Sequence, residues 1–491
     1  FEWARALGAE AADARPRIHN VTANIFSVLG EVTENPVAAT ALGPLKVIPK
    51  EYPGFECRNI DLNLRQDGNV SLAHMLWQEC IRNTDLSVAL RGDFRWVRVF
   101  DQGSSENVAP ARIQQGATYL VTGGLGGIGF ILARHLAQAA GADLVLIGRT
   151  PLSDIESGPT GDDARRKLER LSELRSFGTR VEYFSADVSD LNQMKEALNA
   201  AAADSQGIRG VIHAAGVAGG GVIQKRSREE CARVLDPKVK GTLVLDELFR
   251  TTTLDFLLLC SSTTAVLGEF GQVDYAAANL FLDAFASRDT TPEPAVISVN
   301  WDTWKEVGMA AETSVPAGLR QARKRGLETG ISNAEGIEIL ERILASSQSQ
   351  LVVSTRNLQS RIEAERFFTP DTIPAMRDTA QQHDRPELSS KFRPPESTTQ
   401  SAIARIWEGS LGIRRVGADD DFFELGGDSL LATQVISRIR DELGVSVPMP
   451  GFFNHPTLSG LSESIDTIRW ATAQDSEALP DAKDHRETFE L

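Results

Sequence analysis

The sequence has 491 residues, of which 42% are hydrophobic and 24% are charged, the composition of an ordinary globular protein with length for roughly two to four domains. Its formal net charge of −16 argues against nucleic acid as a partner. No apolar run approaches the roughly 18 residues of a membrane span and no signal-like leader begins the chain, so we expect a cytoplasmic protein without a membrane partner.

The cysteines carry no sign of a disulfide framework or a metal site. There are four, with neither CxxC pairing nor metal-ligand spacing, at Cys57, Cys80, Cys231 and Cys260. We expect them to be reduced and expect no metal. Because the chain begins at Phe1 rather than Met, we also expect it to be part of a longer polypeptide.

The first 114 residues mix short strands and helices. We expect β-strands in the runs 46–49 and 96–100, which are rich in valine, isoleucine and aromatic residues. No nucleotide-binding fingerprint occurs here, so residues 1–114 are expected to form a domain without its own cofactor site.

From residue 117 onward, short apolar runs alternate with helical stretches. The expected strands are 119–121, 144–147, 181–184, 210–213, 256–259 and 296–299. This alternation predicts an α/β fold with a doubly wound parallel sheet. The charged stretch 153–166, which contains glycine and proline, is expected to be a surface insertion.

A glycine-rich turn follows the first of these strands and opens the helix expected at 130–140. It consists of Gly123, Gly124, Leu125, Gly126, Gly127, Ile128 and Gly129. Glycines at these spacings let a pyrophosphate approach the backbone and the positive end of the helix dipole. The strand, turn and helix together predict a dinucleotide site.

Residues after the next three strands extend this site. Arg149 stands where an acidic residue would bind the ribose 2′-hydroxyl, and its cation favours the 2′-phosphate of NADPH. Asp187 and Val188 end the third strand, where a carboxylate can accept a hydrogen bond from adenine. The small residues after the fourth strand leave space for the nicotinamide ribose, in the run His213, Ala214, Ala215 and Gly216. A histidine at such a position is more often a core residue than a catalyst.

Four polar residues further along can reduce a ketone. Tyr275 and Asn279 are four residues apart and share a helix face. Ser261 and Ser262, on the strand before them, point to opposite sides, so only one of the two can face the cofactor. Tyr275 would donate the proton, and Ser262 would help to stabilise the developing alkoxide. Lys238 is expected to lower the pKa of Tyr275, whereas Lys240, two residues along the same helix, faces nearly away.

This stretch, about residues 115–366, resembles the ketoreductase domain of modular polyketide synthases, within the short-chain dehydrogenase/reductase superfamily. Lys238 precedes Ser262 by 24 residues, Tyr275 follows by 13, and Asn279 by four more, which are the family's intervals. The resemblance implies that these four are catalytic. It also implies that residues 1–114 form the family's structural subdomain, a degenerate Rossmann-like half.

The last part of the chain is expected to form a separate helical domain. Residues 367–397 turn polar and proline-bearing, as in a linker, residues 398–470 read as helical, and the charged residues 471–491 are expected to be a disordered tail. Ser429 follows a glycine pair and an aspartate and begins an amphipathic helix, where a phosphodiester would meet unpaired N–H groups.

The segment around Ser429 resembles the phosphopantetheine attachment site of acyl and peptidyl carrier proteins, which form small four-helix bundles. The two resemblances imply a ketoreductase–carrier segment of a polyketide or hybrid synthase, with NADPH and 4′-phosphopantetheine on Ser429 as cofactors. Its expected partners are a ketoacyl chain tethered to the carrier, a phosphopantetheinyl transferase and the other synthase domains. The substrate is expected to be a 3-keto acyl thioester. Two alternatives stay open: a 2-keto acyl substrate, as in depsipeptide-forming synthetases, and a reductase fold that is catalytically dead. The configuration of the product hydroxyl is also open.

Overall fold

The computed structural model describes residues 5–6, 16–52, 54–64, 69–82, 85–103, 112–156, 162–202, 207–288, 296–309, 327–366, 384–386, 388, 390–427, 429–445, 447, 451–452 and 455–477. The chain divides into two compact units, the larger made of residues 14–315 and 319–368, the smaller mainly of residues 369–491. No helix among the described residues is long and apolar enough to cross a membrane.

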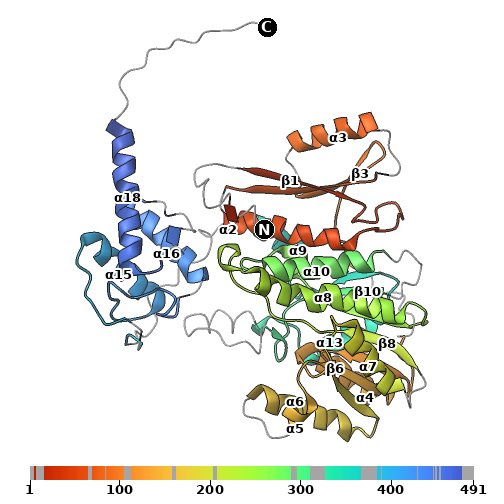
Figure 1. Ribbon diagram of the computed structural model, residues 1–491. Coiled ribbons are helices and arrows are strands. Elements are labelled where there is room, and N and C mark those ends of the chain that lie inside the picture. The colour runs from red at the N-terminus through yellow and green to blue at the C-terminus, as the bar shows by residue number, and fades with distance from the viewer. Residues whose placement is uncertain are drawn as a thin grey trace. The chain divides into compact units, whose positions relative to one another are not determined.

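A four-stranded sheet forms the first part of the larger unit (Figure 1). Its strands follow one another in the order β1 (Arg17–Ala23), β2 (Glu56–Leu62), β3 (Ser87–Arg91) and β4 (Phe94–Val97). The first three are parallel and β4 is antiparallel to β3. The accompanying helices are η1 (Pro36–Ala41), α2 (Leu42–Glu51) and α3 (Asn69–Arg82).

One strand expectation in this region was wrong. Residues 46–49 lie inside helix α2, and of the run 96–100 only the first two residues belong to β4. Val47 and Ile48 are buried, so tertiary packing overrides their preference for strands. Gly43 lets α2 approach helix α10 (Val273–Ala286) closely, because a Cβ atom there would lie 2.5 Å from the Ala277 nitrogen.

The second sheet has seven parallel strands and confirms the doubly wound α/β fold. Its order is β11-β10-β9-β8-β5-β6-β7. The strands are β5 (Thr118–Thr122), β6 (Asp143–Gly148), β7 (Val181–Ser185), β8 (Ile208–His213), β9 (Phe256–Ser262), β10 (Val296–Trp301) and β11 (Gln350–Val352). Neighbouring strands pair in parallel throughout.

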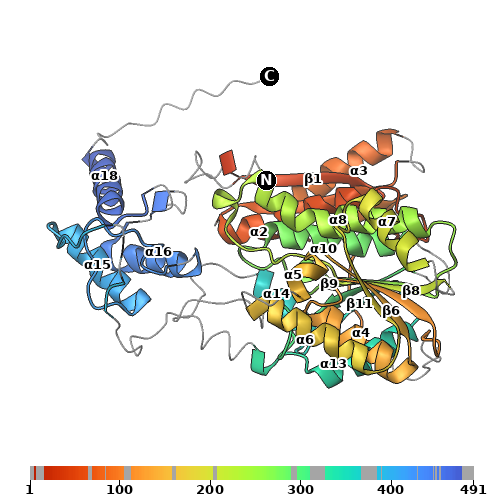
Figure 2. The ribbon, with the colours of Figure 1, turned by 60° about the horizontal axis from the view of Figure 1, so that its bottom comes forward.

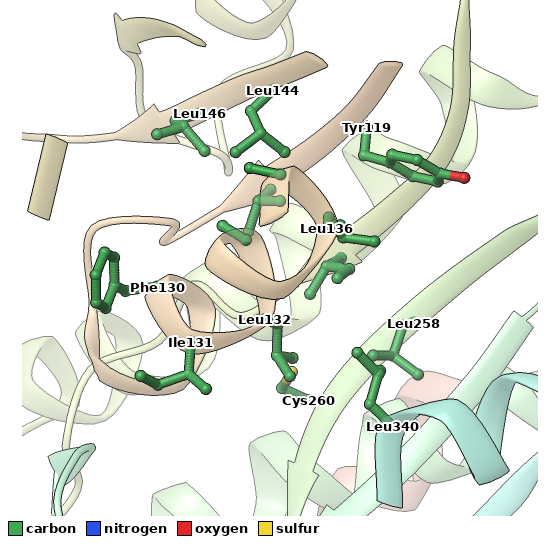
Figure 3. Packing of buried hydrophobic residues seen from close by; sticks show 14 of the residues in the cluster. Tyr119, Phe130, Ile131, Leu132, Leu136, Leu144, Leu146, Leu258, Cys260 and Leu340 are labelled. Carbon is green, nitrogen blue, oxygen red and sulfur yellow. The ribbon is translucent and has the colours of Figure 1, made fainter. Parts of the chain in front are cut away.

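Helices cover both faces of this sheet (Figure 2). One face carries α4 (Gly127–Ala140), α6 (Asp162–Ser176) and α13 (Asn333–Leu344), and the other carries α7 (Leu191–Ala202), α8 (Arg228–Phe249) and α10. Side chains of β6 alternate between the two cores. Leu144 and Leu146 pack in the α4 core (Figure 3), and Val145 and Ile147 pack in the opposite one.

Shorter elements lie between or after these helices: α5 (Leu152–Glu156), η2 (Ile223–Lys225), α9 (Thr264–Leu267) and α14 (Leu358–Arg366). The expected insertion at 153–166 contains most of α5 and the start of α6, with residues 157–161 outside the described range. Further along α6, Leu171 and Leu174 are buried in the core. Most of this segment is therefore regular helical structure.

The smaller unit is helical around an aromatic core. It contains α15 (Thr398–Leu411), α16 (Ser429–Leu443) and α18 (Leu458–Glu477). The Trp407 and Phe422 ring centroids lie 5.0 Å apart, and those of Phe422 and Phe452 lie 5.1 Å apart. Helix α18 continues beyond the expected domain end at residue 470, and residues 478–491 of the expected tail lie outside the described residues.

Candidate active site

The glycine-rich turn joins the carboxyl end of β5 to the start of α4. Gly123 has φ +69°, a conformation that favours glycine. A Cβ atom on Gly129 would lie only 2.4 Å from the Gly123 carbonyl oxygen, and one on Gly123 would lie 2.9 Å from Ala214 backbone atoms. Arg170 of α6 donates to the Leu125 carbonyl at 2.9 Å, so a side chain far along the sequence also holds the turn.

A pocket of about 190 Å³ opens beside this turn, where strand order changes direction between β8, β5 and β6. Of the residues expected to bind cofactor, its lining includes Gly123, Leu125, Gly126, Arg149, Asp187, Val188, Ala215 and Gly216. The other six do not line it: Gly124, Gly127, Ile128, Gly129, His213 and Ala214. The glycine cradle and the position of the pocket fit a dinucleotide.

Two cations line this pocket. Arg149 is exposed, and its guanidinium forms no ion pair with any residue in the described part of the chain. Lys167 of α6 also lines the pocket, bonds Thr150 Oγ1 at 2.9 Å and pairs with Asp163 at 2.6 Å. The sequence did not predict Lys167 as a site residue, because only tertiary packing brings α6 next to the pocket.

His213 is buried, and its two ring nitrogens hydrogen-bond to neighbouring elements. Its Nε2 lies 3.0 Å from the Pro237 carbonyl, which can only accept, so Nε2 donates and Nδ1 accepts from the Thr122 hydroxyl at 2.7 Å. Burial, followed by the nearby Lys238 charge, lowers the pKa of His213 to about 3. The neutral ring thus ties β5 and β8 to α8 next to Lys238.

Lys238, Ser262 and Tyr275 come together where β9, α8 and α10 meet. Lys238 is 4% exposed, donates from Nζ to the Cys260 carbonyl at 2.6 Å, and lies 5.8 Å from the Tyr275 ring centroid. Lys240, by contrast, is 60% exposed and pairs with Asp236. Asn279 donates from Nδ2 to the Tyr275 carbonyl at 2.8 Å, one helical turn back.

The electrostatics of this cluster differ from the sequence expectation. Burial raises the pKa of Tyr275, and hydrogen bonds with Asn279 and Ser262 oppose the rise. Burial also lowers the pKa of Lys238 to about 8. The net shift of the Tyr275 pKa is therefore upward, and Lys238, which was expected to lower it, is not among the groups that set this shift.

A buried polar network behind the cluster was not anticipated. Asn300 donates to Ser261 Oγ at 2.9 Å, to the Ser262 carbonyl at 3.1 Å and to Asp283 Oδ2 at 2.8 Å. Ser298 Oγ donates to Asp283 Oδ1 at 2.7 Å. These bonds fix the end of β9 and thereby the backbone that carries Ser262. In the sequence, the polar residues Ser298 and Asn300 within an otherwise apolar strand could have indicated this network.

A run of three glycines, residues 219–221, passes beside Tyr275. A Cβ atom on Gly219 would lie 2.6 Å from the Tyr275 Cβ, and Gly220 and Gly221 have φ of +146° and +114°. Arg226 donates to the Gly220 carbonyl at 3.0 Å and pairs with Asp274. Gly219 therefore lies directly against Tyr275, where a larger residue would clash with the tyrosine.

In the smaller unit, Ser429 is the first residue of α16. The preceding turn places Gly426 at φ +94°, and a Cβ atom on Gly427 would lie 2.3 Å from the Phe422 ring. Asp428 lies outside the described residues. Among the residues that the structure describes, no group of three or more His, Cys, Asp or Glu side chains could hold a metal ion.

Two protein families match the chain. Residues 117–306 match the KR domain, and residues 401–465 match the phosphopantetheine attachment site. Polyketide synthase PksM of Bacillus subtilis is 30% identical over 79% of this chain, and a phenolphthiocerol/phthiocerol polyketide synthase of Mycobacterium tuberculosis is 29% identical over 92%. The chain spans only 9% and 24% of the lengths of these two relatives.

Solved structures give the same assignment for the larger unit. The crystal structure of a ketoreductase domain from the bacillaene assembly line is 27% identical, with a TM-score of 0.62 over 74% of this chain and 83% of that one. An A1-type ketoreductase is also 27% identical, with a TM-score of 0.61 over 74% of this chain and 73% of that one. The chain therefore joins a KR domain to a phosphopantetheine-binding carrier domain and is related to the polyketide synthases.

Proposed function

We propose that the larger unit is an NADPH-dependent ketoreductase and that its substrate is a 3-keto acyl chain held as a thioester on phosphopantetheine at Ser429. The main support is the convergence of Lys238, Ser262 and Tyr275 at the end of β9, next to the glycine-cradled pocket. Reducing a ketone needs a hydride and a proton, and this arrangement offers a cofactor pocket for the first and a tyrosine for the second.

The nucleotide contacts follow from the pocket. We assign the pyrophosphate to the backbone N–H groups at the start of α4, where the helix dipole is positive. Arg149, with Lys167 beside it, would pair with the 2′-phosphate, which favours NADPH over NADH. One Asp187 oxygen already accepts from Ser189, at 2.6 Å from its hydroxyl, and the other can accept from the adenine amino group. NADPH, when bound, supplies the hydride.

The proton-transfer roles follow from the cluster. Because burial keeps Tyr275 protonated at neutral pH, its phenol can donate to the alkoxide oxygen as negative charge develops there. Ser262 would donate a hydrogen bond to the same oxygen. Lys238 would add positive charge beside the tyrosine, and Asn279 would fix the helix turn that carries it.

A second candidate is reduction of a 2-keto acyl chain. The sequence Gly426-Gly427-Asp428-Ser429 is the form common in peptidyl carriers, which keeps this alternative open.

The test is to offer 3-keto and 2-keto acyl thioesters with NADPH to the full chain and to measure NADPH consumption. We expect turnover of the 3-keto substrate and little of the 2-keto substrate. Preference for the 2-keto thioester would establish the second candidate. Absence of turnover with both, in protein shown to bind NADPH, would instead indicate a catalytically dead reductase.

A further inference from the structure

A chain of hydroxyl groups leads away from the proposed catalytic pair and ends on a carboxylate. Tyr275 hydrogen-bonds with Ser262, whose Oγ lies 3.2 Å from Thr264 Oγ1. Thr264 Oγ1 in turn lies 3.0 Å from Glu269 Oε2. The Thr264 backbone N–H also donates to Ser262 Oγ at 3.2 Å, and Thr264 is 4% exposed. This chain connects the reaction centre to Glu269.

Charged groups surround Glu269 on several elements. Glu365 and Arg361 face it from α14, Lys50 faces it from α2, and the Tyr275 phenol lies in reach of its charge from α10. Arg361 pairs with Asp302 at 2.7 Å, and Lys50 pairs with Glu365 and donates to the Leu267 carbonyl at 2.9 Å. Burial and then repulsion from Glu365 raise the pKa of Glu269, which the Thr264 hydrogen bond and the two cations oppose.

The protonation state of the Glu269 carboxyl decides in which direction the Thr264 and Ser262 hydroxyls donate their hydrogen bonds. An ionised carboxylate can only accept, so it draws the Thr264 proton toward itself, and Thr264 then accepts from Ser262, as in the structure. In that direction the Ser262 proton points away from the substrate. A protonated Glu269 can donate to Thr264, Thr264 can then donate to Ser262, and Ser262 is free to donate to a substrate oxygen.

We propose that Glu269 is a positioning residue for the reduction, acting through Thr264 to set the direction of the Ser262 hydroxyl and to return a proton to Tyr275. This inference rests on the proposed ketoreductase function. It assigns to Glu269 a task beyond those of the four predicted catalytic residues, of which Ser262 is a link in this chain but does not itself reach solvent through it.

The proton return balances at each step. After Tyr275 has given its proton to the alkoxide, the Ser262 O–H bond breaks and a new O–H bond forms on the tyrosine. Thr264 then gives its proton to Ser262, and Glu269 gives its proton to Thr264. The result is a neutral Tyr275, two restored hydroxyls and a Glu269 carboxylate. Glu269 is partly exposed and takes its next proton from water.

The test compares pH profiles of kcat for the full chain and its variants Glu269→Gln and Thr264→Val, with NADPH affinity measured alongside to show that each variant is folded. Wild-type kcat should fall as pH rises through the Glu269 pKa, above the usual carboxyl range. In both variants that decline should be absent, with kcat ~10-fold below the wild-type acidic plateau. Combining the two changes should lower kcat no further, because they interrupt one chain.

Glu365→Gln is the matched control, since Glu365 faces Glu269 and has no hydrogen bond to Thr264 among the described contacts. It should keep the decline but move it to lower pH, because removing the neighbouring negative charge lowers the Glu269 pKa. A Glu269→Gln profile that matches the wild type, or loss of the decline in Glu365→Gln alone, would overturn the proposal. If wild-type protein reduces no keto thioester, the proposed function fails instead.

Discussion

Arg149 and Lys238 show how differently two cations of one site can behave. Arg149 is exposed at the pocket edge and available to a ligand, whereas Lys238 is buried, with its ammonium bonded to a backbone carbonyl. The first is suited to binding an anionic group and the second to placing charge beside the Tyr275 phenol. Each can be tested separately.

Arg149→Ala should weaken NADPH binding by about 1.5–3 kcal/mol, the contribution of a hydrogen bond to a charged group, and should barely change NADH binding. Equilibrium titration of both nucleotides provides the measurement. An equal loss for NADPH and NADH would mean that Arg149 supports the pocket rather than reading the 2′-phosphate.

The two lysines of α8 form a natural matched pair. Lys238→Met should lower kcat at least ~10-fold, because it removes the cation next to Tyr275. Lys240→Met should leave kcat within about twofold, because this side chain is exposed and its pairing with Asp236 contributes little. If Lys240→Met proved to be the damaging change, the assignment of Lys238 would be wrong.

His213 should make the fold sensitive to acid. Its folded pKa of about 3 lies below the ordinary value of 6.5, so its stabilisation is complete above pH 6.5 and is lost as pH falls toward 3. Relative to His213→Gln, the wild type should lose roughly 1.4 kcal/mol of unfolding free energy per pH unit within that window. Chemical denaturation of both proteins at pH 7, 6 and 5 measures this difference. The same change of unfolding free energy with pH in the wild type and in His213→Gln would contradict the prediction.

At the scale of elements, the glycine turn acts as one unit with the start of α4. Gly129→Ala would place a methyl group 2.4 Å from the Gly123 carbonyl oxygen, so the turn must open. NADPH affinity should fall at least ~10-fold, because displaced N–H groups no longer match the pyrophosphate. Gly103→Ala is the control, since a Cβ atom there meets nothing within 4 Å. Equal NADPH affinity of the two variants would contradict the proposal that the glycine turn binds the pyrophosphate.

The elements that could be predicted from sequence are those fixed by local pattern. The strand at 119–121, the glycine turn after it and the later expected strands of the second sheet follow from short-range spacing, whereas the edge strand β11 was not predicted. Helix α2 could not be predicted, because Val47 and Ile48 favour a strand and only their burial against the rest of the larger unit makes them helical. The same holds for the site: Ser262 and Tyr275 are at recognisable intervals, whereas Lys167 and Glu269 are brought in by tertiary packing.

At the scale of the whole molecule, a KR domain and a carrier domain lie on one chain. The smaller unit places Ser429 at the start of a helix, where a phosphodiester would be stabilised, and the larger unit brings together Lys238 and the end of β9, the groups that we propose for reduction. The chain spans a minor part of its polyketide synthase relatives, so most of each relative lies outside the matched segment.

The most direct test is to load a 3-ketoacyl phosphopantetheine from its coenzyme A thioester onto Ser429 with a phosphopantetheinyl transferase, add NADPH, and follow the mass of the carrier-bound chain. We predict that the chain gains two hydrogen atoms. Ser429→Ala should accept no phosphopantetheine. Tyr275→Phe should load normally and reduce the chain ~10²–10⁴-fold more slowly. Loading that survives in Ser429→Ala, or reduction that proceeds at the wild-type rate in Tyr275→Phe, would contradict the central claim.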